Sequence, residues 1–298
     1  LTVDGGTIKL DGNYPTGTNN VALGDTALDD GSLSGGNNVA IGSGALTANT
    51  SGSFNTAVGT SALAANTTAN SNTAFGREAL SLNTTGVTNT AVGVNALQAN
   101  TTADNNTAVG NVSLDANTTG ASNTAVGAGS LSGNTTADNN TAVGKDALLA
   151  NTTGTANSSL GQFALGANTT GGQNTAAGRY ALGANTTGSS NTAFGNEALN
   201  TNQTGSDNTA VGAYALDANN NASNNTAVGS AALGANTTGS EGTAVGQGAL
   251  SANTTGTQNT AVGRKALEVN TEGAGNTAVG QRALDANTTA SDNTAIGR

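Results

Sequence analysis

A 17-residue repeat runs along almost the whole chain, and this period constrains the fold more than any other feature. A short motif ending in Gly recurs at Gly24, at Gly42 and then at a constant 17-residue spacing as far as Gly297, without an insertion or deletion after Gly42. Such regular self-similarity is typical of a structural element that stacks on copies of itself. The sequence therefore predicts a solenoid.

Each repeat predicts strands and turns, because a 17-residue unit is too short for two helices. The commonest form reads Asn-Thr-Ala-Val-Gly, two variable residues, Ala-Leu, two more variable residues, Asn-Thr-Thr-Gly and two polar residues. Thr56, Ala57 and Val58 alternate with the period of two of a strand, and Asn-Thr-Thr-Gly is turn chemistry. We expect two short strands and two turns per repeat, in an all-β parallel β-roll or β-solenoid of about seventeen 17-residue coils.

Two apolar columns of the stack are expected to form the core. The fourth residue after the Gly is Leu in every copy from Leu28 to Leu284. The residue before the Gly is Val, Ile, Leu or Phe except at Ala177, and we expect it to face the Leu column across the coil interior. The coil after Ala177 carries Phe194, whose ring is expected to fill the space that Ala177 leaves.

Three further columns have expected roles. The Ala two positions before the Gly, replaced only at Ser159, should lie on the opposite strand face against another backbone. The Gly should occupy a corner with positive φ, where a Cβ would be strained. Asn begins the motif everywhere except at Gly242, and stacked amides can form a ladder along the axis.

Composition excludes most chemistry. The chain has no Cys and no His, which removes the usual thiolate and imidazole metal sites and the Cys-His and Ser-His-Asp catalytic sets. The net charge of −10 opposes binding to nucleic acid phosphates, and no apolar run approaches the roughly 18 residues of a membrane span. We therefore expect no enzyme, no catalytic, cofactor or metal site, no nucleic acid partner and no membrane insertion.

The motif resembles a known adhesin repeat. Asn19-Asn20-Val21-Ala22-Leu23-Gly24 and the segment 37–42 resemble the Asn-Ser-Val-Ala-Ile-Gly signature of YadA-like head repeats in trimeric autotransporter adhesins, and the resemblance covers about residues 19–298. It implies a left-handed β-roll, a homotrimer of chains side by side, an extracellular location and adhesion to surfaces. It also implies that the Ala column faces the trimer interface.

The opening of the chain favours one variant of that function. Residues 5–15, followed by Asn-Val-Ala-Leu-Gly, resemble segments of tail-fibre proteins of marine bacteriophages, which also carry long Asn-Thr-Ala-Val-Gly arrays. The 17-residue repeat is longer than the usual adhesin repeat, and most copies have Thr where the signature has Val. We expect a structural adhesive fibre segment of a virion tail fibre that attaches to a cell surface, with the head of a bacterial trimeric surface adhesin as the alternative.

The expected organisation has two parts. Residues 1–18 are predicted to form an N-terminal adaptor or cap, and residues 19–298 the β-roll array, which is expected to continue beyond this segment. The expected partners are further copies of the chain, other fibre domains and a glycan or protein on the host cell surface.

Two groups of variable side chains are candidate binding sites. Phe163, Tyr180 and Tyr214 occupy the second position after the Gly, with Glu197 between the tyrosines, so a sugar ring could stack on them. Their alternative role is packing over neighbouring turns or a trimer seam. The second group is basic and lies near the end of the chain; its members are Arg264, Lys265, Arg282 and Arg298. It suits contact with an anionic polysaccharide or an adjoining fibre domain. Its alternative role is pairing with Glu268 and Asp285 on a solvated surface.

Two other functions fit the repeat. An ice-binding solenoid would present the regular Thr column that begins at Thr56, Thr73 and Thr90, although such proteins usually pair two Thr columns. A purely structural spacer would bind nothing at all.

Overall fold

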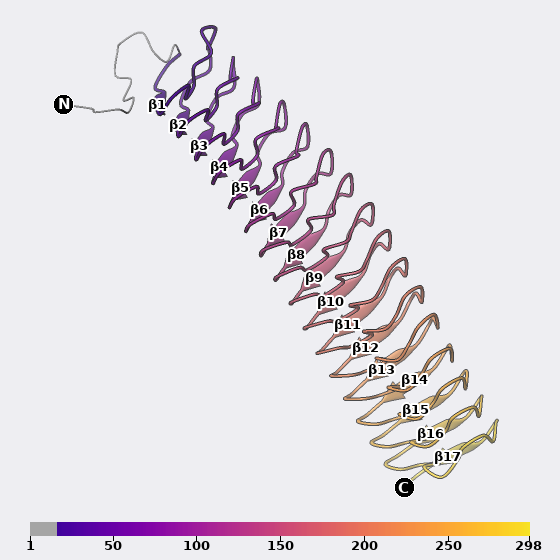
Figure 1. Cartoon of the computed structure of the whole chain (residues 1–298). Helices are drawn as coiled ribbons and strands as arrows, with labels where there is room; N and C mark the ends of the chain where they lie inside the picture. Colours follow the sequence, from indigo (N-terminus) through magenta and orange to yellow (C-terminus); the bar gives the residue numbers. More distant parts are fainter. Residues whose placement is uncertain (1–16) are drawn as a thin grey trace. The chain divides into compact units, whose positions relative to one another are not determined.

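The computed structural model describes residues 17–298 and is all-β, with one short strand per repeat and no helix in that range. The predicted adaptor or cap, residues 1–18, lies almost wholly outside the described residues. The described residues fall into two compact units, residues 17–146 and 147–298. The strands, labelled in Figure 1, are β1 (Val21–Leu23), β2 (Val39–Ile41), β3 (Thr56–Val58), β4 (Thr73–Phe75), β5 (Thr90–Val92), β6 (Thr107–Val109), β7 (Thr124–Val126), β8 (Thr141–Val143), β9 (Ser158–Leu160), β10 (Thr175–Ala177), β11 (Thr192–Phe194), β12 (Thr209–Val211), β13 (Thr226–Val228), β14 (Thr243–Val245), β15 (Thr260–Val262), β16 (Thr277–Val279) and β17 (Thr294–Ile296).

Within each unit the strands stack in parallel and in sequence order. In the first unit, which holds β1 to β8, Ala57 lies opposite Ala74, and every later pairing keeps the same 17-residue offset. In the second unit, β9 to β17, Ala210 lies opposite Ala227 in the same way. Successive strands delimit about 16 turns. This confirms the predicted parallel β-solenoid and its columns of equivalent residues.

The prediction of two strands per repeat is wrong. The Ala-Leu segment after each strand forms turns, and Leu63 has a left-handed φ of 50°. That conformation costs a non-glycine residue roughly 1–2 kcal/mol, and it interrupts the extended path that a second strand needs. Pairing between turns nevertheless continues there, because the Leu63 N–H donates to the carbonyl of Ala79 at 3.0 Å.

The predicted orientation of the strand is also wrong, because its inner and outer faces are exchanged. Ala57 is 0% exposed and shares the interior with Leu63, whereas Val58 lies on the half-buried outer face. Phe194 is 46% exposed and therefore does not fill interior space beside Ala177. The interior is already occupied by the Leu, Ala and Asn columns, so the larger strand residues point outward and the Ala column cannot form a trimer interface.

Two ladders of buried asparagines line the interior. The ladder that was predicted, called the strand-start ladder, is formed by the Asn that begins each motif. In it the Asn72 N–H donates to Asn55 Oδ1 at 2.9 Å, and Asn55 Nδ2 donates to the Ala69 carbonyl at 2.9 Å. The turn ladder, formed by the Asn of each Asn-Thr-Thr segment, was not predicted. Its Asn83 Nδ2 donates to Asn66 Oδ1 at 3.2 Å. Because buried amides are costly unless they are hydrogen bonded, these ladders are what makes a polar interior stable.

The corner glycines behave as predicted. Gly93 has a φ of 136°, and a Cβ on it would lie 2.3 Å from the carbonyl oxygen of Gly110 in the next turn. No side chain can occupy that space without moving the backbone of the next turn. The regular spacing of the motif is therefore a requirement of close backbone stacking.

Candidate functional site

The predicted aromatic site lies at the corner that follows the strand, in the second unit. Phe163, Tyr180 and Tyr214 all have left-handed φ values, of 56°, 56° and 58°. Bulky residues seldom adopt this conformation, but the repeat imposes it on whichever residue stands at this position.

Two of the three aromatic side chains are packed together. The Phe163 and Tyr180 rings stack with their centroids 5.3 Å apart and their planes 2° apart. The Arg179 guanidinium carbon lies 4.5 Å from the Tyr180 centroid, and Arg179 also pairs with Glu197 of the following turn at 3.8 Å. Tyr180 therefore contacts an aromatic ring of the preceding turn and a guanidinium of its own turn. Much of the Tyr180 ring is thus used in packing within the chain.

Tyr214 stands apart from this pair. Glu197 occupies the intervening turn of the same column, and the Tyr214 side chain is 44% exposed. Of the three predicted residues, Tyr214 therefore has the ring most available to a ligand.

A carboxyl group with altered acidity lies in the same turn as Tyr214. Burial raises the pKa of Asp217, and the negative charge of Glu197 raises it further, against hydrogen bonds from the Asp217 and Ala218 backbone. In the first unit burial likewise raises the pKa of Asp115, whose Oδ1 has no hydrogen-bond partner. Neither carboxyl belongs to a metal-binding group, since residues 17–298 contain no cluster of three or more His, Cys, Asp or Glu side chains that could hold an ion.

Two of the four basic residues near the end of the chain are in ion pairs. Lys265 Nζ lies 2.7 Å from Glu268 Oε1, and Arg282 Nε lies 3.9 Å from Asp285 Oδ2. These are the pairings that the alternative interpretation predicted. Arg264 instead donates to Gln247 Oε1 at 3.3 Å. The group is therefore a set of side chains in which two of the four positive charges, those of Lys265 and Arg282, are compensated by carboxylates.

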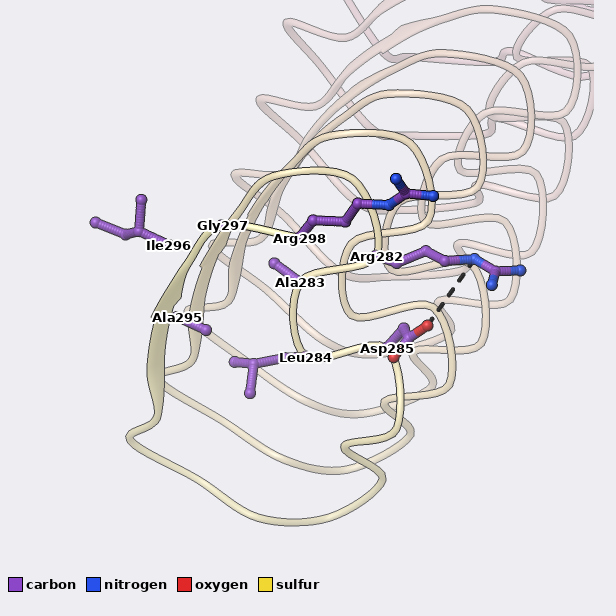
Figure 2. A pocket seen from close by; sticks show the side chains of 8 residues that line it. All are labelled: Arg282, Ala283, Leu284, Asp285, Ala295, Ile296, Gly297 and Arg298. Carbon is purple, nitrogen blue, oxygen red and sulfur yellow. Dashed lines mark ion pairs between the residues drawn. The ribbon is translucent and has the colours of Figure 1, made fainter.

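A hollow of about 430 Å³ lies at the last described turn. Figure 2 shows Leu284 and Ala295 on its inner side, with Arg282 and Asp285 joined across the rim. Because Leu284 belongs to the interior column, the hollow adjoins the interior of this turn. It is lined by Arg282, Ala283, Leu284, Asp285, Ala295, Ile296, Gly297 and Arg298.

An apolar column that was expected inside the coil lies on its outer surface. This outer column consists of the residues that immediately precede the strand glycines. Phe75 in the first unit and Leu160 in the second are each 57% exposed, and the valines of the column from Val211 onward are 37–38% exposed. Nearly every strand of either unit contributes one such side chain, so the apolar surface runs along each stack of strands.

The outer column has a polar neighbour on the same face. Residues two apart on a strand point the same way, and Thr209 and Val211 flank the buried Ala210 accordingly. Each typical strand thus presents one hydroxyl and one apolar group outward. The signal for this arrangement was the alternation in Thr-Ala-Val, but alternation alone does not say which face is inside.

Comparison with known proteins does not assign the chain to a family. No protein-family model matches it, and no curated protein matches it significantly. Among the described residues, no helix has the length and apolar character needed to cross a membrane.

Proposed function

We propose that the chain is a segment of an extracellular structural fibre that attaches to a cell surface, a phage tail fibre in preference to the head of a bacterial adhesin. In this proposal three copies lie side by side in parallel, with their outer columns turned toward a common axis. The left-handed path of the coil, the trimer and the preference for a phage come from the resemblances described above. The repeat supplies length and stiffness, and no catalytic step is assigned to it.

The outer column is the observation that carries the proposal. The interior of each unit is complete without it, since Ala57 and Leu63 in the first unit and Ala210 and Leu216 in the second are 0% exposed in the single chain. Soluble monomers rarely expose contiguous apolar surface beyond a few hundred Å². A line of Val, Ile, Leu and Phe side chains that is interrupted at Ala177 is thus better explained by a covered face than by a solvated one.

The variable residues that follow the corner glycines are available to recognise a ligand. Tyr214 offers an exposed ring, and aromatic rings stack well on the apolar faces of sugars. We assign the host glycan contact to this corner, with the stacked Phe163 and Tyr180 as its neighbours. Contacts with other fibre domains complete the set of proposed partners.

Engineered cysteines test the arrangement of the copies, because the chain has no Cys of its own. Val228→Cys places a thiol on the outer column, and Thr238→Cys places one on an exposed turn of the same repeat. Under mild oxidation of dilute protein, we expect a disulfide-linked dimer from Val228→Cys and none from Thr238→Cys. Equal cross-linking of the two variants, or none in either, would contradict the proposal.

An ice-binding solenoid is the second candidate, and the outer face favours it more than the sequence did. Thr226 and Val228 point outward together, and Thr226 stacks in register on Thr243. Regularly spaced hydroxyl and methyl groups on a parallel sheet can order water. Thermal hysteresis from a monomeric protein would select this function, because the same face cannot bind ice while it is covered by other copies.

A further inference from the structure

Gly242 removes one rung from the strand-start ladder of the second unit. A complete rung is seen at Asn208, whose Nδ2 donates to Asn191 Oδ1 at 3.1 Å and to the Ala222 carbonyl at 2.9 Å. The Asn208 Oδ1 in turn accepts the backbone N–H of Asn225 at 3.0 Å. One carboxamide therefore donates hydrogen bonds to two neighbouring acceptors and accepts one from a neighbouring donor.

The same three groups are present around Gly242, and each lacks the bond that a carboxamide would provide. Asn225 Oδ1 accepts the Gly242 N–H at 2.8 Å but has no amide donor from position 242. The Gly256 carbonyl accepts Asn253 Nδ2 at 2.9 Å but receives nothing from the strand-start ladder. The backbone N–H of Asn259 has no acceptor among the described residues.

These groups are enclosed, so bulk water does not reach them. Asn225 and Asn259 are each 1% exposed. Buried backbone N–H groups without a partner are rare, because leaving one unpaired is costly. The site therefore needs something that accepts one hydrogen bond and donates two.

There is room for such a group where the side chain is missing. A Cβ on Gly242 would lie 3.0 Å from Asn225 Oδ1 and 3.4 Å from Leu233 Cδ1, so its nearest neighbours are side-chain atoms and not the backbone that blocks the corner glycines. Gly242 also lacks the positive φ of the corner glycines, so its backbone matches that of the asparagines it replaces.

We propose that Gly242 creates a binding site for one ordered water molecule, which donates to Asn225 Oδ1 and the Gly256 carbonyl and accepts from the Asn259 N–H. Water has two donors and two acceptors, and buried waters typically make about three hydrogen bonds. A cation is excluded because the Asn259 N–H points its proton at the site. An anion is excluded because two oxygen acceptors face it.

A crystal structure of the full chain, at a resolution that orders buried waters, tests the proposal. We expect one water at 242, within about 2.7–3.2 Å of all three groups. In Gly242→Asn the carboxamide should replace that water and raise the melting temperature. Asn208→Gly is the matched variant, and it should gain an equivalent water on Asn191 Oδ1, the Ala222 carbonyl and the Asn225 N–H.

A second variant keeps the test decisive. Gly242→Ala puts a methyl group into the site without any hydrogen bonds, so it should lower the melting temperature if water is bound there. A higher melting temperature for Gly242→Ala, or an empty gap in the crystal, would show a dry void and overturn the proposal. Density for an ion with shorter contacts would overturn it as well.

Discussion

The two faces of each strand follow different rules, although their residues are adjacent in sequence. The inner position is Ala in every strand but β9, where Ser159 satisfies its hydroxyl by donating to the Ala164 carbonyl at 2.7 Å. The outer position varies among Val, Ile, Leu, Phe and Ala. The inner face is limited in size by the opposite side of its own turn. The outer face has no such limit within the chain.

Removal of an interior side chain should give the largest effect. Leu216 is 0% exposed, and Leu216→Ala should lower the free energy of unfolding by about 2–5 kcal/mol because it leaves a cavity. Urea denaturation followed by circular dichroism measures the change. A loss below about 1 kcal/mol would mean that the Leu column is not the core of the turn.

Enlarging one face and then the other contrasts them directly. Ala227→Val adds bulk to the full interior and should lower the free energy of unfolding by about 1–3 kcal/mol. Val228→Ile adds one carbon to the outer column, where Ala227→Val adds two to the interior, and should change the stability of the turn itself much less. Equal losses in the same denaturation experiment would remove the distinction between the two faces.

The exposed corner allows a prediction about binding. Tyr214→Ala should weaken binding to a glycan array roughly two- to tenfold, as expected for the loss of one aromatic contact. The stability of the fold should change little, because Tyr214 is exposed. Phe163→Leu, which alters the packed pair, serves as the control and should leave binding nearly intact. Undiminished binding by Tyr214→Ala would remove this corner from the proposed contact.

Two aspartates of the first unit should affect stability in opposite directions. Their effects should be smaller than those of the substitutions above. Burial raises the pKa of Asp115 in the folded state, so its negative charge destabilises the fold once the pH rises above the ordinary pKa of 3.8. Asp115→Asn should therefore raise the melting temperature at neutral pH, and the gain should vanish below that value. Hydrogen bonds from Ser32 lower the pKa of Asp30, so its charge stabilises the fold above the unfolded pKa. Asp30→Asn should thus lower the melting temperature at neutral pH.

Melting temperatures measured across the acidic to neutral pH range would test both signs. Curves for Asp115→Asn and Asp30→Asn that shift in the same direction at neutral pH would contradict the assignment. Both effects should be modest, because the Asp115 carboxyl is only partly buried and the Asp30 carboxyl is exposed.

The period and the columns of the fold could be predicted because each turn repeats the same contacts. The invariant Leu column, the corner glycines and the strand-start ladder follow from residues that recur at the 17-residue spacing. The inner face could not be predicted, since Thr56, Ala57 and Val58 distinguish two faces without giving the volume of the interior. Hydrophobicity suggested Val58 for the inside, and the narrow turn selects Ala57 instead.

The candidate site was predictable to a similar degree. The 17-residue spacing of Phe163 and Tyr180 indicates that their side chains can meet, and the rings do stack. The contact of Arg179 with both Tyr180 and Glu197 depends on how a long side chain turns, which spacing does not reveal. The turn ladder was visible as a recurring Asn, but its turn propensity gave it a sufficient explanation at the sequence level.

The mass of the protein in solution, measured by light scattering, tests the central claim most directly. If the outer columns are covered by further copies, the particle should weigh about three times 28.4 kDa, and Val228→Asp should reduce it to a folded monomer. A monodisperse particle of 28.4 kDa for the unaltered chain would contradict the account. The outer face would then be a solvated surface, and ice binding would become the function to test.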